Sequence, residues 1–195
     1  MPKLVKVFYD LETTGVEVKK HSIHQIAGII EVNGVVAEEF DIRTRPHPKA
    51  LIEEGALIAG NVTKEQILGY QDMKDAHKEF KALMHKYIDP FDTTHKAWNV
   101  GFNNRFFDDQ FLRAWFRQNG DNFIGSLFWA DTIDVLVLAS QYLIERRSGM
   151  PSFKLKRVAK ELGLIVEEDK LHNGLYDVKL IREIYRIVTG LEIEI

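Results

Sequence analysis

Two acidic residues at the end of the first apolar segment have the types and spacing of a metal site. Asp10 and Glu12 follow residues 3–9, which are rich in valine and aromatic side chains and predict a β-strand. Side chains two residues apart in a strand point to the same face, with Cα atoms about 6–7 Å apart. Residues 13–15 (TTG) then form a turn whose N–H groups suit phosphate binding. Taken alone, two solvated acids at a strand end remain the simpler interpretation.

A third acid lies on the apolar face of a predicted helix. The helix covers residues 104–118 and ends at an Asn-Gly pair. Asp108 precedes large apolar residues by three, four and seven positions, which places it on their face. A carboxylate there needs a partner, because an unpaired buried charge is costly. The same projection turns Asp109 outward and places Asn104 on the face of Asp108. The alternative is a helix capped by Asn103 or Asn104 with incidental acids.

A second predicted helix, residues 176–188, also carries an acid on its apolar face. Asp177 precedes isoleucine or valine by four, seven and eleven positions. His172 lies five residues earlier, too far round to share a helix face, so we expect it on the loop that leads into the helix. A lone histidine is more often structural than catalytic.

Taken together, the acids predict a common site. Four carboxylates brought together repel one another and retain protons unless cations relieve the repulsion. Oxygen ligands suit Mg²⁺ or Mn²⁺. Two such ions about 3.5–4 Å apart stabilise the attacking and leaving oxygens of a phosphoryl displacement. A histidine that titrates near neutral pH can accept the proton of the attacking water.

The elements that position these residues form an α/β pattern. Strands are predicted at residues 3–9, 24–32 and 35–42, with Asn33-Gly34 as a hairpin turn, and two short strands at 95–99 and 127–130. Helices are predicted at 64–69, 75–87, 104–118, 134–145, 153–162 and 176–188, and residues 43–60 are expected to be irregular. A meander followed by alternating strands and helices predicts a mixed sheet covered by helices.

Bulk composition narrows the class of protein. The 195 residues suit one domain, and the absence of cysteine excludes disulfides and cysteine-type zinc sites. The sequence starts without the apolar run of a secretory signal and has no stretch of about 18 apolar residues, so we expect a cytoplasmic protein without membrane segments. A net charge of −3 does not favour a polyanionic partner, although bound cations and local basic patches offset it.

Three motifs, in this order, resemble those of the DnaQ-like (DEDD) 3′→5′ exonuclease family. The first is residues 8–15 (FYDLETTG), and the second is residues 104–108 (NRFFD) followed by Phe111-Leu112. The third is His172 with Asp177, whose spacing is similar to that of the histidine branch of the family. Each motif is weak alone, but all three at these distances form a specific pattern that covers nearly the whole chain.

The resemblance implies an RNase H-like fold with a five-stranded mixed sheet and a single exonuclease domain over residues 1–195. It implies that Asp10, Glu12, Asp108 and Asp177 bind two Mg²⁺ or Mn²⁺ ions and that His172 is the general base. The residues that it implies for substrate contact are Leu11 and Phe107 against the terminal base or sugar, Thr13 and Thr14 through their backbone at the 3′-hydroxyl, and Asn104 in the second motif. The sequence departs from the family pattern at Asn103, Gly60-Asn61 and Asn173. These departures affect the expected contacts to the end of the substrate strand.

The resemblance is nearest to the epsilon proofreading subunit of bacterial DNA polymerase III. It implies a single-stranded 3′ end as partner, with DNA favoured over RNA, and a polymerase subunit as a further partner. The alternatives are a free-standing nuclease that trims DNA or RNA ends, and a binding module that has lost catalysis. The complete set of five site residues argues against the last.

Other clusters have simpler interpretations. A basic stretch between Arg146 and Lys160 is either a phosphate-tracking edge or a solvated helix face. His21 and His24 are three residues apart, but no third metal ligand is in view. The phenylalanine and tryptophan residues between positions 102 and 116 are expected to be mostly core, and Phe107 alone among them has a motif-based role at the substrate.

Overall fold

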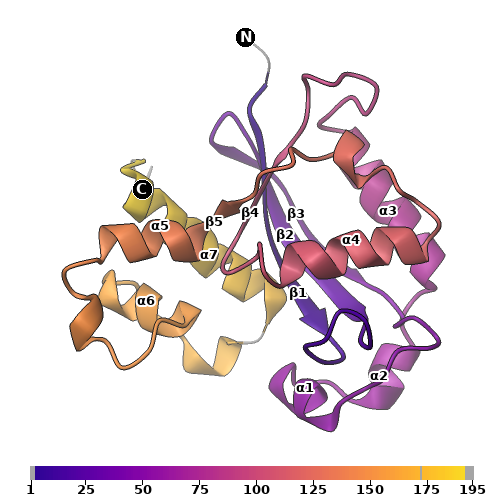
Figure 1. Cartoon of the computed structure of the whole chain (residues 1–195), viewed down its shortest axis with the longest axis horizontal. Coiled ribbons are helices and arrows are strands. Elements are labelled where there is room, and N and C mark those ends of the chain that lie inside the picture. The colour runs from indigo at the N-terminus through magenta and orange to yellow at the C-terminus, as the bar shows by residue number, and fades with distance from the viewer. Residues whose placement is uncertain (1–2, 172, 192–195) are drawn as a thin grey trace.

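One mixed sheet of five strands runs through the middle of the chain (Figure 1). A computed structural model describes residues 3–171 and 173–191. The strands are β1 (Val5–Thr13), β2 (Ile23–Val32), β3 (Val35–Arg43), β4 (Trp98–Gly101) and β5 (Ile133–Asp134). Their order across the sheet is β3-β2-β1-β4-β5. The first three are antiparallel neighbours, whereas β4 and β5 run parallel to β1, so the predicted five-stranded mixed sheet with a leading meander is confirmed.

The central strand β1 separates two hydrophobic cores. Because side chains alternate along a strand, Val7, Tyr9 and Leu11 join a core with α3 (Met73–His85) and α4 (Asp108–Gln118). Phe8 points the other way and joins a core with helices α5 (Val135–Tyr142), α6 (Leu155–Glu161) and α7 (Gly174–Thr189). Asp10 and Glu12 have the parity of Phe8, so they point to the side of the sheet that α7 covers.

Two further helices lie beside the carboxyl-terminal end of β1 (Figure 1). They are α1 (Glu54–Ala59) and α2 (Lys64–Leu68), and α2 begins with a capping box between Thr63 and Gln66. The short 3-10 helices are η1 (Ile124–Ser126), η2 (Arg147–Gly149) and η3 (Glu168–Lys170). The prediction of an irregular segment at residues 43–60 therefore missed α1, which is only six residues long and too short for a clear periodic pattern.

The parallel half of the sheet differs from the sequence prediction. The strand expected at residues 95–99 begins at Trp98, and the strand expected at residues 127–130 is wrong. That segment makes one isolated bridge, Ala97 to Phe128, and β5 is instead the two residues Ile133–Asp134 beside Val100 and Gly101. The apolar residues at 127 and 128 are buried in the core of α3 and α4, so their hydrophobicity reports packing and not strand pairing.

Helix α4 begins at Asp108, four residues later than the sequence pattern predicts. The residues before it form turns, with Asn103 in the left-handed region at φ 61° and Phe107 at φ −125° and ψ −78°. The projection from Asn104 as a helical residue is therefore wrong, although Asp108 still lies at the buried side.

Candidate active site

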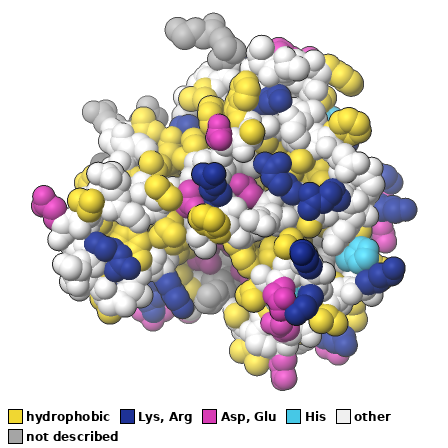
Figure 2. All heavy atoms as spheres, viewed as in Figure 1, with side chains coloured by type: hydrophobic (Ala, Val, Ile, Leu, Met, Phe, Trp, Pro, Cys, Tyr) yellow, Lys and Arg dark blue, Asp and Glu magenta, His cyan; other side chains and the backbone are white. Residues whose placement is uncertain are grey.

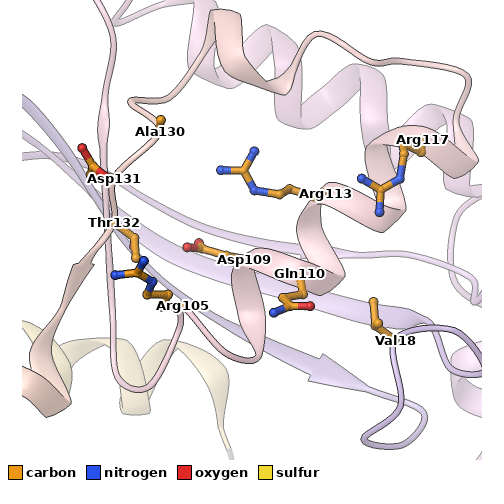
Figure 3. A pocket seen from close by; sticks show the side chains of 9 residues that line it. All are labelled: Val18, Arg105, Asp109, Gln110, Arg113, Arg117, Ala130, Asp131 and Thr132. Atoms are coloured by element: carbon orange, nitrogen blue, oxygen red, sulfur yellow. The ribbon is translucent and has the colours of Figure 1, made fainter.

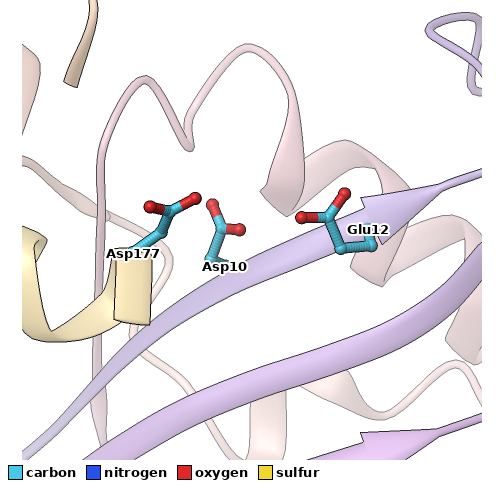
Figure 4. Close-up of side chains that lie close together, drawn as sticks. All are labelled: Asp10, Glu12 and Asp177. Atoms are coloured by element: carbon cyan, nitrogen blue, oxygen red, sulfur yellow. The ribbon is translucent and has the colours of Figure 1, made fainter. Parts of the chain in front are cut away.

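Strand β1 and helix α7 bring three carboxylates together. Asp10 and Glu12 rise from the same face of β1, and Asp177 reaches toward them from the first turns of α7 (Figure 4). One ligand oxygen from each residue lies within 4.8 Å of the others. The same-face geometry predicted for the two strand acids is thus the geometry of this group.

The position of Asp177 depends on how closely α7 approaches the sheet. The Asn173 side chain caps the helix by accepting a hydrogen bond from the Tyr176 N–H at 3.3 Å. At Gly174, a Cβ atom would come within 2.9 Å of the Ala27 side chain on β2, closer than real Cβ contacts. Glycine at this position therefore lets the first turn of α7 lie against the sheet, which places Asp177 over β1.

The fourth predicted ligand, Asp108, is fastened to β1 from the α4 side. Its Oδ1 accepts a hydrogen bond from the Leu11 N–H at 3.1 Å, and its side chain is buried. Asp108 does not belong to the group of three within 4.8 Å, but its charge acts on Asp10 and it in turn feels the charge of Glu12. It therefore borders the same site.

The cluster holds its protons more tightly than ordinary acids do. Burial, followed by the charges of Asp108, Glu12 and Asp177, raises the pKa of Asp10 well above its usual value. Burial and Asp177 raise the pKa of Glu12 to about 7. Burial raises the pKa of Asp108 to about 8, although backbone hydrogen bonds to its carboxylate oppose the shift. At neutral pH these acids therefore retain part of their protons, and positive charge in the site favours their release.

The donor set fits divalent cations that prefer oxygen. It consists of carboxylates alone, and acids with raised pKa values gain most from a cation that replaces their protons. Asp10, Glu12 and Asp177 would share one such ion, and Asp108 would serve a second ion next to Asp10. His172, the predicted general base, lies outside the described residues, so its role stays a prediction.

A polar cavity of about 290 Å³ adjoins the cluster. One wall is the turn between α1 and α2, where a Cβ at Gly60 would lie 3.5 Å from Glu12 Oε2. The other wall includes Lys170, Leu171 and Asn173. The hollow therefore lies beside Glu12, at the edge of the carboxylate cluster.

Comparison with known proteins places the chain in a family. A family model described as an exonuclease, RNase_T, matches residues 7–185. The chain belongs to this exonuclease family. The enzyme class predicted from the sequence, a 3′→5′ exonuclease related to the DnaQ-like family, is confirmed at the family level. A search of curated protein sequences finds no match.

Solved structures of E. coli exonuclease I share the exonuclease fold. A complex with a dA16 oligonucleotide aligns with a TM-score of 0.77 and 21% identity over 97% of this chain and 41% of that chain. The zinc-bound form of its complex with single-stranded DNA aligns with a TM-score of 0.76 and 20% identity. That alignment covers 96% of this chain and 40% of that chain. This chain thus spans about two fifths of the length of those proteins. The likeness confirms the mixed sheet flanked by helices.

The residues predicted to contact substrate differ from one another in burial and in hydrogen bonding. Leu11 is buried beneath the site, and Phe107 is half-buried against Phe111, with ring centroids 4.9 Å apart. The Thr14 N–H donates to the Ser22 carbonyl at 2.9 Å, so this amide is occupied within the fold. The predicted contact to a 3′-hydroxyl therefore rests on Thr13.

Asn104 has a structural position where a substrate contact was expected. It is 0% exposed, and its Nδ2 donates to the Thr132 hydroxyl at 2.6 Å. A Cβ at Gly101 would meet the Asn104 side chain at 2.7 Å, so the turn before α4 packs directly on β4. Asn104 thus ties the second motif to the loop before β5.

Asp109 was predicted to face outward, and this is wrong. It is 7% exposed, and its Oδ1 accepts hydrogen bonds from the Tyr9 hydroxyl and, at 3.3 Å, from the Asn99 side chain. Because α4 starts at Asp108, its first turn lies against β1 and β4, and both neighbouring acids are covered. The alternation of Tyr9 with Asp10 offered a signal, since it places a polar hydroxyl on the α4 side of β1.

The remaining clusters are mostly structural. Lys156 and Lys160 of the basic stretch both pair with Glu168, at 2.8 and 2.6 Å, and Arg157 pairs with Glu161 at 2.9 Å, which favours a solvated helix face with internal ion pairs. His21 lies 3.0 Å from a Glu53 oxygen, and the pair of His21 and His24 does not form a metal group among the described residues. Phe106, expected in the core, is 73% exposed next to the site.

Proposed function

We propose that the protein is a metal-dependent exonuclease that releases mononucleotides from the 3′ end of single-stranded DNA. The observation that carries this proposal is the convergence of Asp10, Glu12 and Asp177 from two elements, with ligand oxygens within 4.8 Å. Membership of the exonuclease family supports the reaction. The choice of single-stranded DNA follows E. coli exonuclease I, whose solved complexes contain such strands.

Each side chain then has a defined task. Two bound Mg²⁺ or Mn²⁺ ions would stabilise the charge that develops on the attacking and leaving oxygens of phosphodiester hydrolysis. The carboxylates of Asp10, Glu12 and Asp177 hold donor oxygens in place before substrate arrives, and the hydrogen bond from Leu11 orients Asp108. His172 would accept a proton from the attacking water. Phe107 would pack against the terminal nucleotide.

The test uses single-stranded DNA and RNA labelled at either end, with Mg²⁺, with Mn²⁺ and with chelator. Asp10→Asn and Asp177→Asn remove ligand charge at constant volume. Asp75→Asn is the matched control, because Asp75 is an exposed acid on α3 that pairs with Lys78. Immediate release of mononucleotide from the 3′ label, abolished by chelator and in the two site variants alone, supports the proposal. Absence of release from both polymers with both metals contradicts it and favours a binding module.

The cellular role predicted from the motifs is proofreading beside a DNA polymerase subunit, and the alternative is a free-standing nuclease. Faster removal of a mismatched than a matched 3′ end, together with co-purification of a polymerase subunit, would support proofreading. Equal rates and no such partner would support the free-standing role. No helix in the described part of the chain is long and apolar enough to cross a membrane. A cytoplasmic location remains our expectation.

A further inference from the structure

Three arginines line a cavity of about 380 Å³ that extends alongside α4 (Figure 3). Arg105 comes from the turn before the helix, whereas Arg113 and Arg117 come from α4 itself. Arg113 and Arg117 are four residues apart, which places them on one face of the helix. The opposite wall is the loop at Ala130–Thr132, which Arg113 faces in Figure 3. Lys and Arg side chains gather on this face of the molecule (Figure 2).

No ion pair within 4 Å joins any of these three arginines to an acid in the part of the chain that the structure describes. Asp109 and Asp131 also line the cavity, and the charge of Arg113 acts on Asp109, whose Oδ1 accepts hydrogen bonds from Tyr9 and Asn99. The arginines thereby differ from the lysines of α6, which share Glu168. In a chain with a net charge of −3, an open cavity lined by three arginines and two acids is a locally positive feature that suits an anion.

The cavity lies close to the carboxylate cluster along the chain. Arg105 is three residues before Asp108, so their Cα atoms are at most about 11 Å apart. Asp109, which lines the cavity, follows Asp108 directly. The partly buried Phe107 and the exposed Phe106 lie between Arg105 and the metal ligand. A nucleic-acid strand whose end lies at the carboxylates would therefore pass the two phenylalanines and then reach the cavity lined by arginines.

A polyanion at this site needs such a cationic contact. Carboxylates repel phosphates until cations bind, and most of the affinity for nucleic acid comes from basic side chains. The guanidinium fork matches phosphate oxygens with two parallel hydrogen bonds. Resting on the proposed function, we infer that the Arg105–Arg113–Arg117 cavity binds a backbone phosphate of the single strand, upstream of the nucleotide that is removed. This contact makes kcat/KM for hydrolysis depend on the length of the nucleic-acid strand.

The decisive variants are Arg113→Gln together with Arg117→Gln. Lys156→Gln together with Lys160→Gln is the matched control, because it removes two cations that are already paired with Glu168. Arg113→Lys with Arg117→Lys keeps the charge and removes the fork. All these side chains are at least partly exposed, and circular dichroism with urea unfolding verifies the fold of each variant.

The readout is kcat/KM on a trinucleotide and on an oligonucleotide of about 20 nucleotides, longer than a typical single-strand site. We expect the ratio of the long to the short substrate to fall at least about tenfold in the glutamine variant, as expected when charged hydrogen bonds are removed. The control pair keeps the wild-type ratio. The lysine variant recovers part of the loss. An unchanged ratio in the glutamine variant, with an active wild type, overturns the inference and leaves the proposed function standing.

Binding of the long strand in chelator tests the inference apart from catalysis. The slope of log affinity against log salt should become flatter by about 0.7 for each phosphate that the variant no longer neutralises. If the wild type hydrolyses nothing, the proposed function fails and this slope alone decides the inference. Inorganic phosphate tests the other source of the same chemistry. Phosphate inhibition of trinucleotide hydrolysis that the glutamine variant escapes, with no change in the length ratio, would assign the cavity to free phosphate and overturn the strand contact.

Discussion

Replacing Glu12 by glutamine should stabilise the metal-free protein while it removes nuclease activity. Glu12 is a carboxylate held next to Asp177 and Asp10 in a mostly buried position. This position suits metal binding. Without a metal, repulsion among the neighbouring acids destabilises the folded state. Glutamine keeps the size of the side chain and removes the charge.

The magnitude follows from the pKa of Glu12, which is about 7 in the folded protein against an ordinary value of 4.5. Between these two pH values the folded state retains a proton that the unfolded state has released, so stability falls as pH rises. At about 1.4 kcal/mol for each pH unit, the full loss above pH 7 is about 3 kcal/mol. Glu12→Gln avoids this loss, so its advantage should be absent near pH 4 and reach about 3 kcal/mol near pH 8.

The assay is urea unfolding of wild type and variant at these two pH values, in chelator and then with Mg²⁺ or Mn²⁺. Metal stabilises the folded state by mass action, by about 2.7 kcal/mol at one hundred times its dissociation constant. The wild type should therefore gain more from metal than the variant does. Glu54→Gln is the control, since Glu54 is exposed on α1.

Two results would refute the reasoning. Equal stability of wild type and Glu12→Gln near pH 8 in chelator would show that the carboxylate is not held in a repulsive, desolvated site. Equal stabilisation of both proteins by metal would show that Glu12 does not take part in holding the ion.

Three further predictions concern residues around the site. Tyr9→Phe removes the shorter hydrogen bond to the buried Asp109 and leaves the longer one from Asn99, so the free energy of unfolding should fall by about 1–3 kcal/mol, measured in urea; an unchanged midpoint would contradict the buried network. Burial lowers the pKa of His24 from 6.5 to about 4, so the folded state resists protonation and about 3 kcal/mol of stability should disappear as pH falls from 6.5 to 4. His24→Leu should flatten that pH profile, and a retained slope would assign it to other groups. Gly174→Ala inserts a methyl group against β2 and should displace Asp177, so activity should fall more steeply at low metal concentration than at saturation; equal loss at both concentrations would indicate a different cause.

Local periodicity was sufficient to predict which face of its strand or helix each of these candidate metal ligands occupies. A strand has a period of two, so Asp10 and Glu12 had to share a face wherever the strand lay. Asp177 had to lie on the apolar side of its helix because the helical period left no other placement. That these acids meet in one place required the motif resemblance, since nothing in local periodicity relates β1 to α7.

The tertiary structure alone decided the surroundings of α4. The helix begins at Asp108 because the preceding turn packs Asn104 on β4, a contact between segments that periodicity cannot detect. The same start buries Asp109 against Tyr9. The arginine cavity forms only because the loop at Ala130–Thr132 covers one side of the helix. Sequence patterns report which face of an element is apolar, whereas the partner that covers each face depends on long-range packing.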